Sequence, residues 1–336
     1  MRSRFVQNDK GFGLTHCSLF SFAFRAPFAI VFESEPNNIM RTLILSVLLF
    51  SCIASAQECT THVVVNVYEP KIGLDVETLT AADFDASLEH HRTPLTVTGA
   101  SQNYTSRLLV LLETDEAAKK PEIGEVIDTV TRLARQAPEG EPVAFGVFAD
   151  RAVFTKGFFP DAAERAKAIN AVREEADAVG KRVAMYDSLL AAVKLFGPHQ
   201  PGDTLLLVAG AYDDKSSHSS GAVEQAVRAA GVRFMVMLRE PLSAVAHADF
   251  LTNSHEIEKK MYTDLSLSTG GAYTDFDPHF FSFAWRGYML DIKATEGRRG
   301  GPAKWKLRLT GEKADKLRKA KIYVPQLLPP CEKTTS

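Results

Sequence analysis

The residue types best suited to chemistry lie in an acidic turn that follows the apolar run Leu108–Leu112. Glu113, Thr114, Asp115 and Glu116 come directly after that run. A continuous apolar run of this kind is typical of a strand buried on both faces of a parallel sheet. Ligands of open α/β sheets usually bind at the carboxyl ends of such strands. We therefore expect a site, if the chain has one, at this turn.

Motifs of common catalytic and cofactor sites are missing from the sequence. It has no Gly-x-Ser-x-Gly motif, phosphate loop, Gly-x-Gly-x-x-Gly fingerprint or Cys-x-x-Cys pair. Histidines occur at His90, His91, His247 and His255, without the His-Glu-x-x-His spacing of a zinc site. Asp213–Ser217 lacks the twelve-residue calcium pattern, and a helix N-cap region is the simpler interpretation.

The acidic turn also carries a resemblance to a known family. The VWFA-related group of bacterial secreted von Willebrand factor type A domains has the loop Asp-x-Ser-x-Ser after an apolar strand. The matching positions here are Glu113, Asp115 and Ala117. Leu79–Phe84 is similar to the family's Leu-Thr-x-x-Asp-Phe segment, and Thr269–Gly271 matches its Thr-Gly-Gly. The resemblance implies a von Willebrand A-like α/β fold: a doubly wound, mostly parallel six-stranded sheet with helices on both faces.

The family's site binds Mg²⁺ or Mn²⁺ through oxygen ligands from three loops, and this chain departs from that pattern. The second loop, Lys181–Asp187, places Val183 where the family has threonine. The third loop places Ala209 where the family has aspartate. With Ala117, three of the five ligand positions therefore lack a side-chain oxygen. Hard cations need such a set in near-octahedral geometry, so we expect neither a metal nor another cofactor.

Two carboxylates remain in the first loop, and they need an explanation. Without a cation, Glu113 and Asp115 would repel each other and raise each other's pKa. We expect a basic side chain in place of the metal, either from a partner or from this chain, where Lys181 and Arg182 are the candidates. A weak Mg²⁺ or Mn²⁺ site formed by Glu113, Asp115 and Asp213 stays open as the alternative.

The elements that must position these turns alternate between strand and helix from residue 105 to 279. Strands are expected at 107–113, 143–148, 152–159, 204–209, 232–238 and 272–276. Helices are expected at 122–136, 184–196, 221–230 and 257–268. A further helix begins at Asp161, with an expected apolar face of Ala162, Ala166, Ile169 and Val172. Strand 152–159 should pair antiparallel through the Asp150-Arg151 turn, and the alternation implies right-handed crossovers.

Short β segments flank this region on both sides. They are expected at 63–68, 84–88 and 95–97, and again at 288–294, 305–309 and 321–324. Neither group can bury a core alone. We therefore expect residues 57–104 and 280–336 to form one small antiparallel β subdomain beside the von Willebrand A-like domain at 105–279.

Residues 40–56 have the features of a secretory signal peptide. One arginine precedes the apolar run Leu43–Phe50, and Ala54-Ser55-Ala56 forms the cleavage site. Cleavage would leave Gln57 first, and the mature chain is expected to be periplasmic or extracellular. Residues 1–39 are interpreted as a start assigned too far upstream, with a real extension as the alternative. Lipidation at Cys52 is disfavoured because Phe50 is too bulky for the usual motif.

The cysteines agree with export. Cys17 and Cys52 lie in the part removed, which leaves Cys59 and Cys331 at the two ends of the mature chain. In an oxidising compartment an even pair is interpreted as one disulfide. Two free thiols on the chain ends are the alternative.

Composition limits the functions to be considered. The chain has 336 residues, 45% of them hydrophobic, and a formal net charge of -2. This is typical of a globular protein with one large and one smaller domain. The charge gives no case for nucleic acid or an anionic membrane surface, and no membrane span is expected in the mature chain.

Three function classes remain. The leading one is an exported, non-catalytic binding module of adhesion or scaffold type that contacts an unidentified extracytoplasmic protein without metal. Its expected binding surface is Glu113, Thr114, Asp115, Ala117, Val183, Ala209 and Asp213. The second is a residual cation-dependent adhesion domain. The third is a hydrolase, which needs a serine, a histidine and an acid in one pocket. Analogy of fold supports most of the first class.

Overall fold

The computed structural model describes residues 59–69, 74–75, 79–89, 93–210, 212–239, 252–294 and 303–329. A six-stranded sheet has the strand order β10-β9-β8-β5-β6-β7. Its strands are β5 (Leu108–Glu113), β6 (Val143–Phe148), β7 (Ala152–Phe154), β8 (Thr204–Ala209), β9 (Arg233–Leu238) and β10 (Tyr273–Asp275). All pairs are parallel except β6 with β7 at the edge. The predicted mostly parallel sheet is confirmed.

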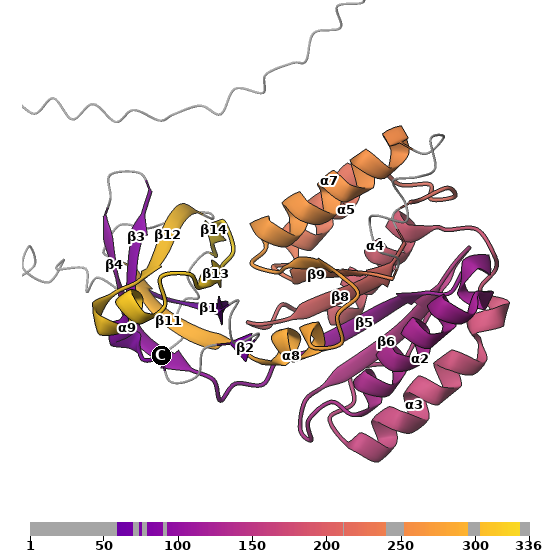
Figure 1. Ribbon diagram of the computed structural model, residues 1–336, viewed down its shortest axis with the longest axis horizontal. Coiled ribbons are helices and arrows are strands. Elements are labelled where there is room, and N and C mark those ends of the chain that lie inside the picture. Colours follow the sequence, from indigo (N-terminus) through magenta and orange to yellow (C-terminus); the bar gives the residue numbers. More distant parts are fainter. Residues whose placement is uncertain are drawn as a thin grey trace, which may run out of the picture. The chain divides into compact units, whose positions relative to one another are not determined.

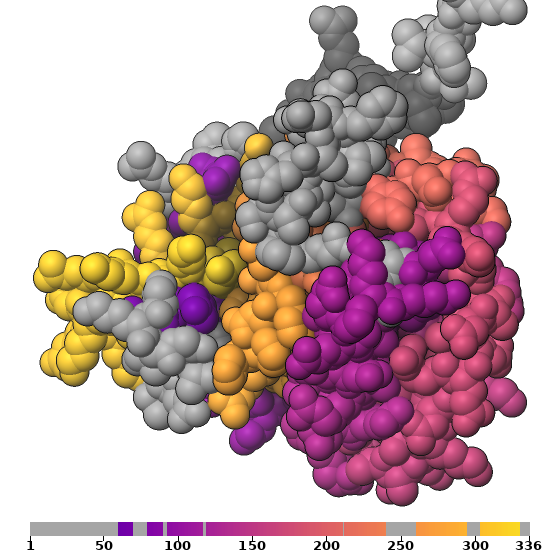
Figure 2. All heavy atoms as spheres, turned by 45° about the vertical axis from the view of Figure 1, so that its right-hand side comes forward, coloured from indigo at the N-terminus to yellow at the C-terminus, as the bar shows by residue number. Residues whose placement is uncertain are grey.

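Helices cover both faces of this sheet (Figure 1). One face carries α2 (Pro121–Arg135), α3 (Ala162–Glu174) and α8 (Phe280–Trp285). The other carries α4 (Met185–Phe196), α5 (Ser220–Ala229) and α7 (Thr252–Ser268). The central strand β5 serves both cores, since Leu108, Val110 and Leu112 enter one and Leu109 and Leu111 the other. Figure 2 shows α2 and α3, in magenta and pink, side by side at the surface.

A second sheet is antiparallel and has the order β13-β1-β11-β4-β3-β12-β14, with β2 beside β1. Its strands are β1 (Cys59–Glu69), β2 (Leu74–Asp75), β3 (Phe84–Leu88), β4 (Pro94–Ser101), β11 (Tyr288–Ala294), β12 (Ala303–Leu309), β13 (Lys321–Tyr323) and β14 (Leu327–Leu328). Strand β11 lies between β1 and β4, so the sheet joins segments from both flanks of the α/β region. A separate core of Val65, Val67, Leu290 and Trp305, among others, supports it.

The edge strand β7 is shorter than predicted. It ends at Phe154, and Phe159 forms only an isolated bridge with Val143. Thr155 explains the interruption, because its hydroxyl accepts from the amide of Phe145 at 3.1 Å and donates to the carbonyl of Gly157 at 2.9 Å. A side chain thus replaces the backbone ladder at this point.

The buried face of α3 also differs from the prediction. Ala162 is exposed, whereas Arg165 is fully buried. The Arg165 guanidinium donates to backbone carbonyls of Arg135, Ala137, Glu141 and Pro160. A long side chain with five N–H donors can close the carboxyl end of α2 in this way, which an alanine cannot.

Several sequence expectations fall outside the described residues. They include the signal peptide, the segment before it, the His90-His91 pair and Cys331. Within the ranges that the structure describes, no helix is long and apolar enough to cross a membrane.

Candidate ion-pair site at the carboxyl ends of the strands

A buried guanidinium lies between the two carboxylates of the first loop. Arg239, the residue directly after β9, places Nη1 2.7 Å from Oδ1 of Asp115 and Nη2 2.9 Å from Oε1 of Glu113. The side chain of Arg239 is 1% exposed, and those of Glu113 and Asp115 are 0% and 2% exposed. The contact with Asp115 is a charge-assisted hydrogen bond, a class among the stronger hydrogen bonds in proteins, and the contact with Glu113 is an ion pair. The site is therefore closed by a cation that belongs to the chain.

The third loop completes the surroundings of the carboxylates. The amide of Gly210 donates to Oε2 of Glu113 at 2.7 Å, and the hydroxyl of Tyr212 donates to Oδ2 of Asp115 at 3.1 Å. Burial raises the pKa of Tyr212, and the charges of Asp115 and Glu113 raise it further. Tyr212 is therefore a neutral donor at any physiological pH, and each carboxylate accepts from a donor of the third loop as well as contacting Arg239.

The expected internal salt bridge is present, but the expected basic residues were wrong. Lys181 pairs with Glu116 at 3.5 Å and Arg182 with Asp214 at 3.4 Å, and all four side chains are largely exposed. The backbone causes this arrangement. The amides of Lys181 and Arg182 both donate to Oδ1 of Asp150, at 3.0 and 2.6 Å.

The residues present do not fit the divalent cation that the resemblance implied. Arg239 already occupies the space between Glu113 and Asp115, while Val183 and Ala209 are fully buried in an apolar core. Ala117 lies in the short 3-10 segment Glu116–Lys119. Among the described residues, no group of three His, Cys, Asp or Glu side chains is placed to hold a metal.

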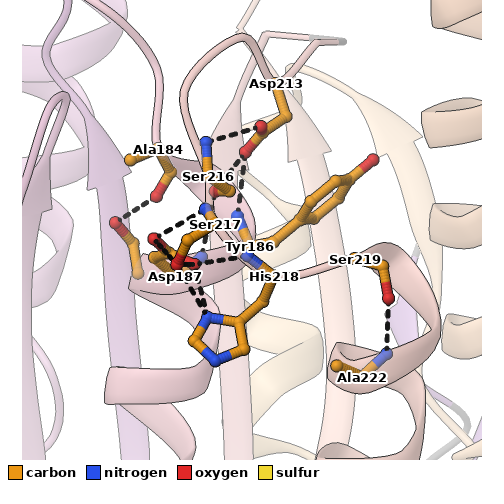
Figure 3. Close-up of polar contacts among 10 residues, drawn as sticks. Ala184, Tyr186, Asp187, Asp213, Ser216, Ser217, His218, Ser219 and Ala222 are labelled. Carbon is orange, nitrogen blue, oxygen red and sulfur yellow. Dashed lines mark hydrogen bonds and ion pairs between the residues drawn. The ribbon is translucent and has the colours of Figure 1, made fainter.

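Asp213 is engaged elsewhere, which corrects the alternative that used it as a metal ligand. Its Oδ2 accepts from the amide of Tyr186 at 3.0 Å and from the hydroxyl of Ser216 at 2.6 Å (Figure 3). Tyr186 is in the first turn of α4, so Asp213 satisfies a free amide there. The helix-cap interpretation of 213–217 is therefore correct, although the helix capped is α4.

The second and third loops are joined by further carboxylates. Oδ1 of Asp214 accepts from the amide of Val183 at 2.7 Å. Asp150 pairs with Lys215 as well as with the loop before α4. The bond from Lys215, followed by those from Arg182 and Lys181, holds the pKa of Asp150 below its usual value. The loops at the carboxyl edge are thus held together by side-chain carboxylates rather than by a metal.

Ser217, His218 and Asp187 meet at the amino end of α4, as Figure 3 shows. The Ser217 hydroxyl lies 3.0 Å from Oδ2 of Asp187, and Nδ1 of His218 lies 2.7 Å from its Oδ1. In a catalytic triad the acid and the serine contact different nitrogens of the imidazole. Here the serine is 3.3 Å from the same Nδ1 that contacts the acid, and its proton has the carboxylate as acceptor. The cluster ties the third loop to the first turn of α4, since the amides of Ser217 and His218 also donate to the Asp187 carboxylate.

The pKa of Asp187 reflects these contacts. Burial raises it, but the bonds from Ser217 and His218 outweigh burial and lower the pKa from 3.8 to about 2. Asp187 is therefore ionised throughout the physiological range. A carboxylate with so low a pKa is a poor general base.

The residues expected to form a binding surface are mostly buried, which corrects that expectation. Glu113, Thr114, Asp115, Val183 and Ala209 are all less than 9% exposed. Thr114 and Asp115 line a cavity of about 630 Å³, whereas a partner cannot reach Glu113, Val183 or Ala209 without moving the loops. The exposed residues around them are Glu116, Lys181, Arg182, Lys215 and His218.

Sequence reasoning missed Arg239 and Tyr212. The rule that located Glu113, a polar residue at the carboxyl end of an apolar strand, also applies to Arg239 after β9. Only the fold shows that their side chains meet, since β8 separates β9 from β5.

No family model and no curated protein sequence matches this chain. Among solved structures, it is similar to an aerotolerance-related membrane protein from Bacteroides fragilis, at 12% identity over 53% of this chain and 94% of that one, with a TM-score of 0.39. It is also similar to von Willebrand factor type A from Catenulispora acidiphila, at 10% identity over 81% and 75%, with a TM-score of 0.39. A third is proximal thread matrix protein 1 from the mussel byssus with a zinc-occupied MIDAS motif, at 13% identity over 58% and 50%, with a TM-score of 0.43. Such likeness concerns the fold alone, and the function must be argued from this chain's own site.

Proposed function

We propose that this protein is an exported, non-catalytic protein-binding module with a von Willebrand A-like domain, in which a built-in ion pair replaces the metal. The observation that carries the proposal is the buried contact of Arg239 with both Glu113 and Asp115. A divalent cation would have to displace this guanidinium and would find few other oxygen ligands. Binding is therefore expected to be independent of Mg²⁺ and Mn²⁺.

The contact surface proposed for a protein partner is the exposed rim of the same loops. It comprises Glu116, Lys181, Arg182, Lys215 and His218, which carry charges of both signs. Exposed charges of this kind set orientation and partner choice more than affinity. The buried ion pair keeps the loops that present them in one arrangement.

The same proposal includes that the protein does not act as an enzyme. The geometry of Ser217, His218 and Asp187 supports it, because hydroxyl and imidazole converge on one carboxylate. The low pKa of Asp187, about 2, supports it as well.

Calorimetry tests the metal-free site. Titration of the wild-type protein with millimolar Mg²⁺ or Mn²⁺ should give no binding heat. The matched control is Asp115→Ala, which removes one of the two carboxylates. A micromolar dissociation constant that Asp115→Ala abolishes would favour cation-dependent adhesion instead.

A charge-reversal experiment tests the binding surface. Crosslinking to proteins of the cell envelope should give the same products with and without chelator. The double variant Glu116→Lys with Lys181→Glu should lose those products. Its control, Glu312→Lys with Lys316→Glu, reverses an exposed pair on α9 (Gly311–Lys316) of the antiparallel layer. Loss of products with chelator, or equal loss in both variants, would contradict the proposal.

Export is tested by sequencing the amino terminus of the protein recovered outside the cytoplasm. Cleavage after Ala56 predicts Gln57 as its first residue. A mature product that keeps residues before Met40 would contradict this part of the proposal.

A further inference from the structure

A cavity of about 280 Å³ lies at the amino ends of β8 and β9 in the six-stranded sheet, at the opposite end of these strands from the ion pair. Two glycines bring its walls close together. A Cβ on Gly202 would lie 3.1 Å from Cγ2 of Val64, and one on Gly231 would lie 3.0 Å from the ring of His199. Both glycines have positive φ, 88° and 66°, so other residues would be strained there.

Apolar groups make up most of the lining. They are Val63, Val64, Val227, Ala229, Ala230, Val232, Leu327 and three prolines. Two of the valines come from β1 of the antiparallel sheet, and the other two from α5 and from the residue before β9. The cavity therefore lies where the antiparallel sheet meets the α/β region. Small-molecule sites are typically apolar cavities at such junctions, with a few polar groups that orient the ligand.

Ionisable residues of the lining are all basic. They are His62, His199, Arg228 and Arg233, and the lining contains no aspartate or glutamate. Carboxylates do lie nearby, since Asp291 is 2.7 Å from His62, Glu224 is 3.6 Å from Arg228 and Asp203 is 3.9 Å from His199. None of the three belongs to the lining, so a ligand inside the cavity meets the basic partner of each pair.

We propose that this cavity binds a small apolar carboxylic acid. Its volume of about 280 Å³ holds about nine non-hydrogen atoms, because one water occupies about 30 Å³ of liquid. The hydrocarbon part packs on the valines and Leu327. The carboxylate lies at the open side, beside His199 and Arg228, which are both exposed. The site is independent of the partner-binding function proposed above.

Calorimetry with straight-chain acids tests the proposal on the full secreted protein. Octanoate, with ten non-hydrogen atoms, should bind about sixteenfold more tightly than hexanoate, since each buried methylene contributes about fourfold. The gain in affinity with chain length should stop beyond octanoate, when the cavity is full.

The neutral analogue 1-octanol should bind about fivefold more weakly than octanoate, which is the upper end of the range for an exposed charge pair. An equal affinity for octanol and octanoate, or no binding of octanoate, would overturn the proposal.

Two sets of variants locate the binding. Ala230→Phe, which adds a ring at the lining, should lower the affinity for octanoate at least about tenfold, whereas Leu267→Phe at an exposed position outside the lining should leave it unchanged.

The double variant His199→Gln with Arg228→Gln should lower the affinity for octanoate about fivefold and leave the affinity for 1-octanol unchanged. Arg318→Gln, an exposed arginine of the other layer, is its control. Because His199 and Arg228 are exposed, this variant tests the site even if Ala230→Phe fails to fold. Unchanged octanoate affinity in the double variant would overturn the proposal.

Discussion

At the scale of single residues, a guanidinium between two carboxylates differs from a metal ion in the direction of its bonds. Arg239 offers N–H donors in a fixed plane, and two of them meet Asp115 and Glu113. An ion can diffuse away from a site, whereas a side chain stays covalently attached beside it. Removing one member of a buried ion cluster is costly, because the others stay behind uncompensated.

The substitution Arg239→Met should therefore destabilise the protein strongly. We expect the free energy of unfolding to fall by about 3 to 5 kcal/mol, the range for breaking a buried ion pair. The triple variant Arg239→Met, Glu113→Gln, Asp115→Asn removes all three charges and should regain most of the loss. Urea denaturation gives both values. A triple variant no more stable than Arg239→Met would contradict the electrostatic explanation.

Asp187 should make stability depend on pH in the acid range. Its pKa is about 2 in the folded protein against a usual 3.8. The stabilisation is thus present above the higher value and is lost as pH falls through the lower one. Asp187→Asn should lower the unfolding midpoint at about pH 5, and the difference from wild type should shrink toward about pH 2. A difference independent of pH would assign the effect to packing.

At the scale of elements, most helices and strands could be predicted, because apolar periodicity is a local property. The predicted helix at 184–196 corresponds to α4, and the predicted strand at 204–209 coincides with β8. The misses have tertiary causes. The burial of Arg165 follows from four carbonyls supplied by other segments, which no pattern along α3 contains. Arg239 was not predicted for the same reason, because its partners Glu113 and Asp115 lie at the end of β5 and in the loop after it.

Arg165→Met tests the importance of those contacts. The substitution keeps an apolar stem of similar length to that of arginine but removes the guanidinium, so buried carbonyls lose their donors. We expect a loss of at least about 3 kcal/mol in the free energy of unfolding. Arg132→Met, at an exposed position on α2, should cost less than about 0.5 kcal/mol. Similar losses in the two variants would contradict a specific role for Arg165.

At the scale of the whole molecule, the antiparallel sheet brings distant parts of the sequence together. The hydroxyl of Thr61 lies 3.4 Å from the carbonyl of Pro329. Each residue is two positions from a cysteine, Cys59 in the first case and Cys331 in the second. Cys331 lies outside the described residues, so the disulfide stays a prediction.

Non-reducing peptide mapping should find Cys59 linked to Cys331. The bridge would close a loop of roughly 270 residues, for which the chain-entropy model gives about 4 to 5 kcal/mol as an upper value. Cys59→Ser should then lower the melting temperature only under non-reducing conditions. Recovery of both cysteines as free thiols from the oxidised protein would contradict the pairing.

Gly210 has a consequence for how the site responds to its surroundings. A Cβ there would lie 3.4 Å from Nη2 of Arg239, so the missing side chain leaves room for the guanidinium to reach across β8 to β5. A cation attached in this way has an effective concentration set by the chain, which neither dilution nor a chelator changes. In an ordinary ion-dependent adhesion site, the occupancy of the site depends on the concentration of the cation in the medium. If this protein works outside the cytoplasm as proposed, its binding-competent arrangement is the same whether the medium is rich or poor in divalent cations.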